Sequence, residues 1–233
     1  MSFILDVLGD ALSELASFGP ELREVVVLTL FVSLTATLIG IGLGVPLGLW
    51  LGQAEFRGRS LVVVAVNMGM GIPPVLAGLV VLLLLWGDGP LGGLDMLFTP
   101  AAMVLVQTLL AIPIAAGVTY ASVVNLAPSA SEQLRALGLK GFARGRVLLS
   151  EVRMGVFAAA AAAFGRVVSE VGAVLIVGGG IAGETQVLTT AIVQQSRQAR
   201  FGAAVALGIV LLVMSFVVNG ALVWAQGTGG RSG

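Results

Sequence analysis

The sequence predicts an all-α membrane protein with about five transmembrane helices. Of its 233 residues, 58% are hydrophobic and only 10% are charged, whereas about a quarter of the residues in a globular protein carry charge. Several apolar runs exceed the roughly 20 residues that a helix needs to cross the hydrocarbon core of a bilayer. We therefore treat residues 1–233 as a single transmembrane domain.

The composition also narrows the functions open to this chain. Its formal net charge is zero and its basic and aromatic residues are not interleaved, so nothing indicates a nucleic-acid surface. Histidine and cysteine are both absent, which removes the usual ligands of zinc, haem and iron–sulfur clusters. An intramembrane protease would need a Ser/His pair, a metal motif or an aspartate pair within its spans. We expect no catalytic residue, no metal site and no cofactor bound by this chain.

Residues 1–19 are expected to form an N-terminal surface helix. Its apolar residues recur at helical spacing among acidic ones: Ile4, Leu5, Leu8, Leu12 and Leu15. The helix either lies on the membrane surface or faces a protein partner. Because the segment lacks the positively charged start of a secretory signal peptide, we expect it to be retained.

The first predicted span, Val25–Leu51, is free of charge. Gly40, Gly44 and Gly48 lie four residues apart within it, a spacing that lets a second helix approach closely. Ordinary tight packing is favoured over a dedicated dimer motif, because glycine is abundant throughout the chain (33 residues).

The second predicted span, Leu61–Trp86, is interrupted in its middle. Gly71, Pro73 and Pro74 fall together there, and a proline pair removes two backbone donors and clashes with the preceding turn. Non-helical backbone at membrane depth is tolerated only against protein or a water-filled cavity. These three residues are therefore candidates for a translocation pathway or gate, with a packed proline kink as the alternative.

Three further spans are predicted. They are Thr99–Tyr120, with Pro113 as a kink, the unusually long Leu148–Val177, and Phe201–Trp224. Gly178–Gln195 is expected to leave the membrane.

The fourth span carries charged residues, which are expensive within a bilayer and are therefore functional candidates. Arg166 and Glu170 lie four residues apart, close enough to pair on one helical face. They either shape a gate that steers an anion or neutralise each other and hold a dimer together. The structural role is favoured.

Lysine and arginine are unevenly divided between the two sides of the predicted spans. One side has Arg57, Arg59, Arg135, Lys140, Arg144, Arg146 and Arg231. The other side has Arg23, Arg197 and Arg200. The positive-inside rule then places the N-terminus outside and the C-terminus in the cytoplasm, which agrees with an odd number of spans.

A long polar segment, residues 128–143, lies between the third and fourth spans on the cytoplasmic side. Ser129 and Glu132 have the S-x-x-E spacing of a capping box, which predicts the start of a helix. Leu134 and Leu137 give this helix an apolar side. Taken alone, the pattern is typical of a loop helix that rests on the membrane.

The stretch from Glu132 to Gly138, EQLRALG, resembles the E-A-A-x-x-x-G signature of bacterial ATP-binding-cassette (ABC) import permeases. In that family the segment precedes the penultimate span and forms a coupling helix that docks on the ATPase subunit. The resemblance implies a type I ABC importer permease fold and an ATPase-coupling role for Glu132, Leu134, Arg135, Ala136, Leu137 and Gly138. The family's usual ending, an isoleucine followed by L-P, is replaced here by Leu148, Ser150 and Glu151.

A second stretch narrows the resemblance to the molybdate, tungstate and sulfate permeases. Gly165–Val193 is similar to the segment in which an S-x-G-E-F-G-A type sequence leads into G-E-T, and Gly71–Val75 resembles an L-P-P-V stretch of the same group. The permease of tungstate importers is the most similar type over nearly the whole chain. This likeness makes Ser169, Glu170 and Gly172 further candidates for the pathway or gate.

The resemblance implies a permease subunit of an ATP-driven importer in a bacterial or archaeal plasma membrane, surrounded by lipid. Its implied partners are a second copy of the chain, a cytosolic ABC ATPase dimer that carries ATP and Mg²⁺, and an external substrate-binding protein. The implied substrate is an oxyanion, tungstate first, with molybdate or sulfate as alternatives. An ion-coupled secondary transporter is the alternative from another class, although the two halves lack the internal repeats expected of one.

Because positive charge is scarce within the spans, an oxyanion would have to be solvated by backbone donors at helix breaks, near Gly69–Pro74 and Gly178–Gly183. Such a path binds weakly, which suits conduction. Selectivity would then lie on the external binding protein.

Overall fold

The computed structural model describes residues 2–17, 19–126, 138 and 141–229. Within these ranges every regular element is a helix. Three helices are long and apolar enough to cross a membrane, or up to five if each of two bent helix pairs counts as one span. The prediction of an all-α membrane protein with about five transmembrane helices is confirmed.

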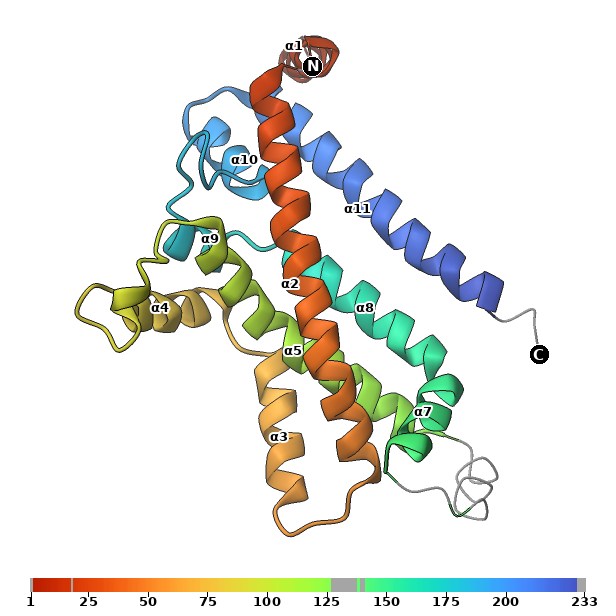
Figure 1. Ribbon diagram of the computed structural model, residues 1–233. Coiled ribbons are helices and arrows are strands. Elements are labelled where there is room, and N and C mark those ends of the chain that lie inside the picture. The colour runs from red at the N-terminus through yellow and green to blue at the C-terminus, as the bar shows by residue number, and fades with distance from the viewer. Residues whose placement is uncertain (1, 18, 127–137, 139–140, 230–233) are drawn as a thin grey trace.

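Three long helices frame the molecule: α2 (Pro20–Gln53), α5 (Pro100–Val124) and α11 (Phe201–Gly229). α2 and α5 pack along much of their lengths. The carboxyl-terminal ends of all three point toward the same side of the molecule, and α7 (Gly141–Glu151) lies there too (Figure 1). The amino-terminal helix α1 (Ser2–Ser17) lies at the opposite end.

The glycines of α2 bring its backbone close to α5. A β-carbon added at Gly44 would lie 2.6 Å from the carbonyl oxygen of Ile112, and one at Gly48 would lie 2.4 Å from that of Ala116. Real β-carbons essentially never approach this closely. The glycine spacing therefore serves packing within the chain, as the sequence favoured.

Gly48→Ala is expected to destabilise the protein by about 1–3 kcal/mol, the usual cost of overpacking. The obstructing atom is a backbone oxygen, which cannot rotate away. The measurement is the unfolding temperature of the detergent-solubilised chain. Gly42→Ala is the matched control, because Gly42 is in the same helix with nothing within 4 Å. Equal behaviour of the two variants would contradict this packing.

The second predicted span is broken, as expected from its prolines. α3 (Arg59–Met70) and α4 (Pro74–Leu85) meet at an angle of 101°. Pro73 precedes α4 in an extended-type conformation (φ −59°, ψ 121°), and Pro74 occupies the first turn of α4, where its missing N–H leaves no bond unmade. A short connection with the 3₁₀ helix η1 (Gly92–Leu94) then leads to α5.

The fourth predicted span, Leu148–Val177, is not one continuous helix. The structure has α7, then α8 (Arg153–Val168) bent from it by 75°, then the short α9 (Gly172–Gly178). At the break between α8 and α9, side chains form hydrogen bonds with the backbone. The Nε2 of Gln107 donates to the carbonyl oxygen of Val167 (3.2 Å) and the N–H of Ala173 donates to Oε1 of Glu170 (3.1 Å). These bonds satisfy a backbone carbonyl and a backbone N–H that would form their hydrogen bonds within the helix if it were continuous.

Residues 178–195, which were expected to leave the membrane, contain most of a further helix, α10 (Leu188–Arg197).

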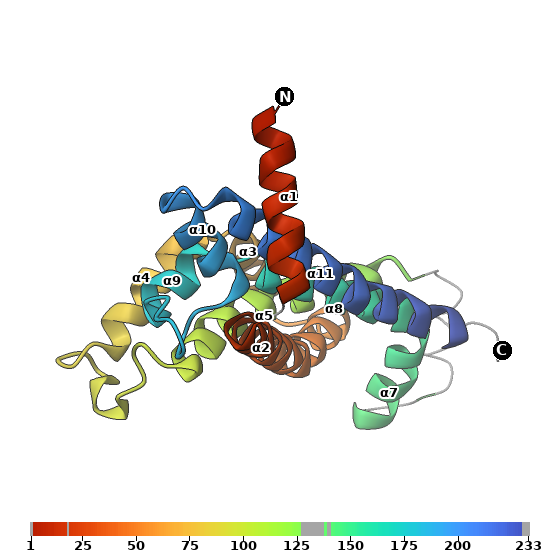
Figure 2. The same cartoon turned by 90° about the horizontal axis from the view of Figure 1, so that it is seen from above.

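The amino-terminal segment forms the helix α1 (Ser2–Ser17). α1 crosses the end of the molecule and packs against α11, where the rings of Phe3 and Phe201 meet edge to face at 5.9 Å (Figures 1 and 2). The larger apolar residues of α1 remain exposed: Phe3, Ile4, Leu5, Leu8 and Leu12. Both interpretations of this helix, membrane-facing and partner-facing, therefore stay open.

Candidate functional site

The helix break between α3 and α4, which the sequence predicted, lies beside the break between α8 and α9, which it did not predict. α4 and α9 pack side by side (Figure 1). A β-carbon added at Gly172 would lie 2.6 Å from Cγ2 of Val75, and one added at Gly78 would lie 2.8 Å from Cα of Ala173. A side chain at Gly78 would thus meet backbone, and one at Gly172 would meet the side chain of Val75.

The proline within α5, Pro113, contacts the end of α3 next to the break between α3 and α4. A β-carbon added at Gly69, near the end of α3, would lie 2.8 Å from Cβ of Pro113, the proline within α5. One turn further along α5, Gly117 makes room for the sulfur of Met70. The end of α3 is therefore seated against the part of α5 that contains its internal proline.

Glu170 forms hydrogen bonds that connect the helices around the break between α8 and α9. Its side chain is 8% exposed, and its carboxylate accepts the N–H of Ala173 at the start of α9. Its own carbonyl oxygen accepts a hydrogen bond from Oγ1 of Thr189 in α10 (2.9 Å). Glu170 thus joins α8, α9 and α10, which is a positioning role.

The predicted pairing of Arg166 with Glu170 is wrong. α8 ends at Val168, so Glu170 does not continue the helical face that carries Arg166. Within the part of the chain that the structure describes, these two side chains form no ion pair, and the carboxylate is bonded to the backbone of α9. The pairing assumed a continuous helix.

Three of the candidate pathway residues lie on the surface of the single chain. Gly71, Pro73 and Ser169 are exposed, whereas Pro74 and Gly172 are half-buried. The hydroxyl of Ser169 donates to the carbonyl oxygen of Gly165 (2.8 Å). Exposed irregular backbone of this kind must face protein or water rather than lipid. The surface formed by the two breaks is thus suited to a protein interface or an aqueous path.

The turn at Gly178–Gly183 is bonded internally. Gly179, Gly180 and Gly183 all have positive φ. The hydroxyl of Thr185 donates to the carbonyl oxygen of Gly178 and accepts the N–H of Ile181. The N–H of Ile181 is therefore not available to an anion.

Most of the predicted ATPase-coupling residues lie outside the described residues: Glu132, Leu134, Arg135, Ala136 and Leu137. Gly138 is described and has a φ of +61°, a left-handed conformation that disfavours any side chain. In the sequence this segment lies between α5 and α7, and the carboxyl-terminal end of α5 and α7 itself lie at the end of the molecule opposite α1 (Figure 1).

The candidate site residues chosen from the sequence did not include several residues that build the site. They are Val75, Gly78, Gln107, Ala173 and Thr189. Gln107 is a lone amide in an apolar span, and that was a usable signal. It is 3% exposed, and its Oε1 has no hydrogen-bond partner among the described residues.

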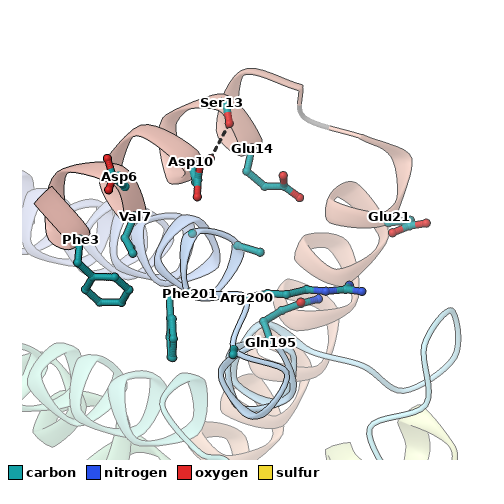
Figure 3. A pocket seen from close by; sticks show the side chains of 13 residues that line it. Phe3, Asp6, Val7, Asp10, Ser13, Glu14, Glu21, Gln195, Arg200 and Phe201 are labelled. Carbon is teal, nitrogen blue, oxygen red and sulfur yellow. Dashed lines mark hydrogen bonds between the residues drawn. The ribbon is translucent and has the colours of Figure 1, made fainter.

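A cavity of about 610 Å³ lies at the end of the molecule that carries α1, between α1 and the start of α11 (Figure 3). Its charged lining is mainly acidic: Asp6, Asp10, Glu14 and Glu21, with Arg200. An excess of carboxylates repels anions. This cavity is therefore a poor site for a free oxyanion.

Comparison with known proteins identifies the family. Residues 44–226 match the model of the family described as binding-protein-dependent transport system inner membrane component. The tungstate uptake system permease protein TupB of Peptoclostridium acidaminophilum is 36% identical over 94% of this chain and 96% of its own length. A probable anion ABC transporter permease of Haloferax volcanii is 38% identical over 85% and 88%, and the TupB of Campylobacter jejuni is 32% identical over 94% and 92%. The chain belongs to the family of inner membrane components of binding-protein-dependent transport systems.

Proposed function

We propose that this chain is the permease subunit of an ATP-driven importer of tungstate. The observation that carries the proposal is the similarity, over nearly the full length of both chains, to a permease named for tungstate uptake. A second relative of the same name and a probable anion permease support the oxyanion class.

The working unit in this proposal is a homodimer in a plasma membrane. Five spans form a small pore-lining unit, and two-fold pairing is the commonest way to complete one. The exposed breaks at Gly71–Pro73 and Ser169 would then face the second copy and line the path or gate. Glu170 would act as a positioning residue, because its carboxylate and carbonyl groups are already bonded within the chain.

Residues 128–143 are proposed as the coupling helix for a cytosolic ABC ATPase, which would carry ATP and Mg²⁺. The arginines near this end, at Arg57, Arg59, Arg144 and Arg146, support a cytoplasmic position by the positive-inside rule. The N-terminus would then lie outside, with the acidic cavity under α1. That cavity suits a basic patch on an external binding protein, which would deliver the anion to the breaks.

Proteoliposomes that contain this chain with its own ATPase, supplied with the external binding protein, are expected to take up tungstate. Uptake should require ATP on the ATPase side and persist when ionophores collapse the ion gradients. Molybdate and sulfate at equal concentration should compete poorly, and calorimetry on the binding protein should give it a lower affinity for them than for tungstate. Stronger competition by molybdate or sulfate would reassign the substrate. Uptake that needs an ion gradient and no ATP would indicate a secondary transporter.

A further inference from the structure

A separate cavity of about 590 Å³ lies between the carboxyl-terminal end of α2 and α7. The carboxyl-terminal end of α2 and α7, which line it, lie on the side of the molecule opposite α1 (Figure 1), and no residue of the two helix breaks is in its lining. Its lining includes Pro46, Leu49, Trp50, Arg144, Arg146 and Leu149. This volume is in the range of cavities that hold small organic ligands.

One arginine of this cavity has a buried donor that finds no acceptor among the described residues. The Nε–H of Arg144 is buried and has no hydrogen-bond partner in the ranges that the structure describes, and the side chain of Arg146 is exposed. Arg59, nearby in sequence to the end of α2, differs: its Nε donates to the carbonyl oxygen of Leu51 (2.9 Å) and its guanidinium lies over the ring of Tyr120. A buried guanidinium donor without an acceptor is costly. The cavity therefore suits a ligand with anionic oxygens, which bind arginine in a forked geometry.

The rest of the lining is mainly apolar and includes an aromatic residue. Trp50 is 50% exposed and stacks on Phe56, with ring centroids 4.8 Å apart. Tryptophan is enriched at the level of lipid headgroups. Pro46, Leu49 and Leu149 extend this apolar surface. A free inorganic anion would use only the arginines, whereas a ligand with both an anionic head and an apolar chain would use the whole cavity.

We propose that this cavity binds an anionic phospholipid, with its phosphate at Arg144 and Arg146 and its acyl chains against Pro46, Leu49 and Leu149. Basic pockets between transmembrane helices on the cytoplasmic side bind anionic headgroups in this way. The lipid bridges α2 and α7, and α7 begins at Gly141, within residues 128–143. It therefore fixes the position of the helix that holds the carboxyl-terminal end of this segment. The inference does not depend on which anion is transported.

The test measures how much phosphatidylglycerol and phosphatidylcholine the full-length chain retains after delipidation, by native mass spectrometry. Phosphatidylglycerol should be retained in preference. Each arginine near an anionic headgroup contributes about a fivefold gain in affinity, so Arg144→Gln with Arg146→Gln should weaken binding about thirtyfold. Arg57→Gln is the matched control, because Arg57 is exposed on the same side and does not line the cavity.

Several outcomes would overturn the proposal. They are equal retention of the two lipids by the wild type, unchanged binding in the double variant, and an equal loss in Arg57→Gln. Displacement of the lipid by inorganic phosphate or tungstate at matched ionic strength would assign the arginines to a free oxyanion instead. If the double variant does not fold, Arg146→Gln alone should weaken binding about fivefold, and the wild-type preference still decides.

Discussion

Gly172→Ala is expected to lower the rate of uptake by roughly 5- to 150-fold, and Val75→Ala in the same chain is expected to restore most of it. The added β-carbon would lie 2.6 Å from Cγ2 of Val75, which forces α4 and α9 apart. Overpacking of this kind costs about 1–3 kcal/mol, and 1.4 kcal/mol corresponds to a factor of ten. Because the obstructing atom belongs to a side chain, shortening that side chain removes the clash.

The measurement is ATP-dependent uptake by proteoliposomes, together with the unfolding temperature of each variant. Gly165→Ala is the control, because Gly165 lies in α8, just before the same break, with nothing within 4 Å. Gly78→Ala should resist rescue by Val75→Ala, because its β-carbon would meet the backbone of Ala173. Wild-type uptake by Gly172→Ala, or a well-folded double variant without rescue, would refute the role of this contact.

Local sequence signals were sufficient for much of the fold. Long uncharged runs predicted α2, α5 and α11, because the bilayer demands about 20 consecutive apolar residues whatever their partners are. The break between α3 and α4 was predictable for a similar reason. Pro73 and Pro74 disrupt a helix through their own covalent structure, without help from distant residues.

The break between α8 and α9 could not be read locally, because distant residues make it. Residues 169–172 contain no proline, and the alanine-rich run before them favours a continuous helix. The bonds that compensate the break come from Gln107, 60 residues earlier than Val167, and from Thr189, 19 residues later than Glu170. The wrong pairing of Arg166 with Glu170 followed from the same assumption of a continuous helix.

In the candidate site, too, some features could be predicted from local sequence and others depend on contacts between distant segments. Gly71, Pro73, Pro74, Ser169, Glu170 and Gly172 were selected from motifs, and the structure brings their two breaks together through Val75 and Gly172. Which glycine meets which neighbour depends on how α4 and α9 cross, and no spacing within either segment encodes that. The glycines of α2 likewise predicted a close approach without naming α5 as the partner.

Glu132→Lys is expected to abolish retention of the cytosolic ATPase during purification, and with it ATP-dependent uptake. In the proposed coupling helix, Glu132 occupies the acidic position of the family signature, and charge reversal at a protein interface places like charges in contact or removes an attractive pair. Gly138→Arg should have the same effect, because Gly138 has a φ of +61° and an arginine would strain the backbone as well as occupy the interface. Co-purification with a tagged ATPase measures both effects.

Glu151→Lys is the matched control for this experiment, since Glu151 is an exposed acid at the end of α7 that lies outside the proposed coupling segment. It should retain the ATPase as the wild type does. Gly138→Ala separates backbone strain from bulk, because no atom of the described residues lies within 4 Å of its added β-carbon. It should weaken retention by roughly a factor of ten, the effect of about 1–2 kcal/mol of left-handed strain. Full retention of the ATPase by both Glu132→Lys and Gly138→Arg would move the coupling site elsewhere on the chain.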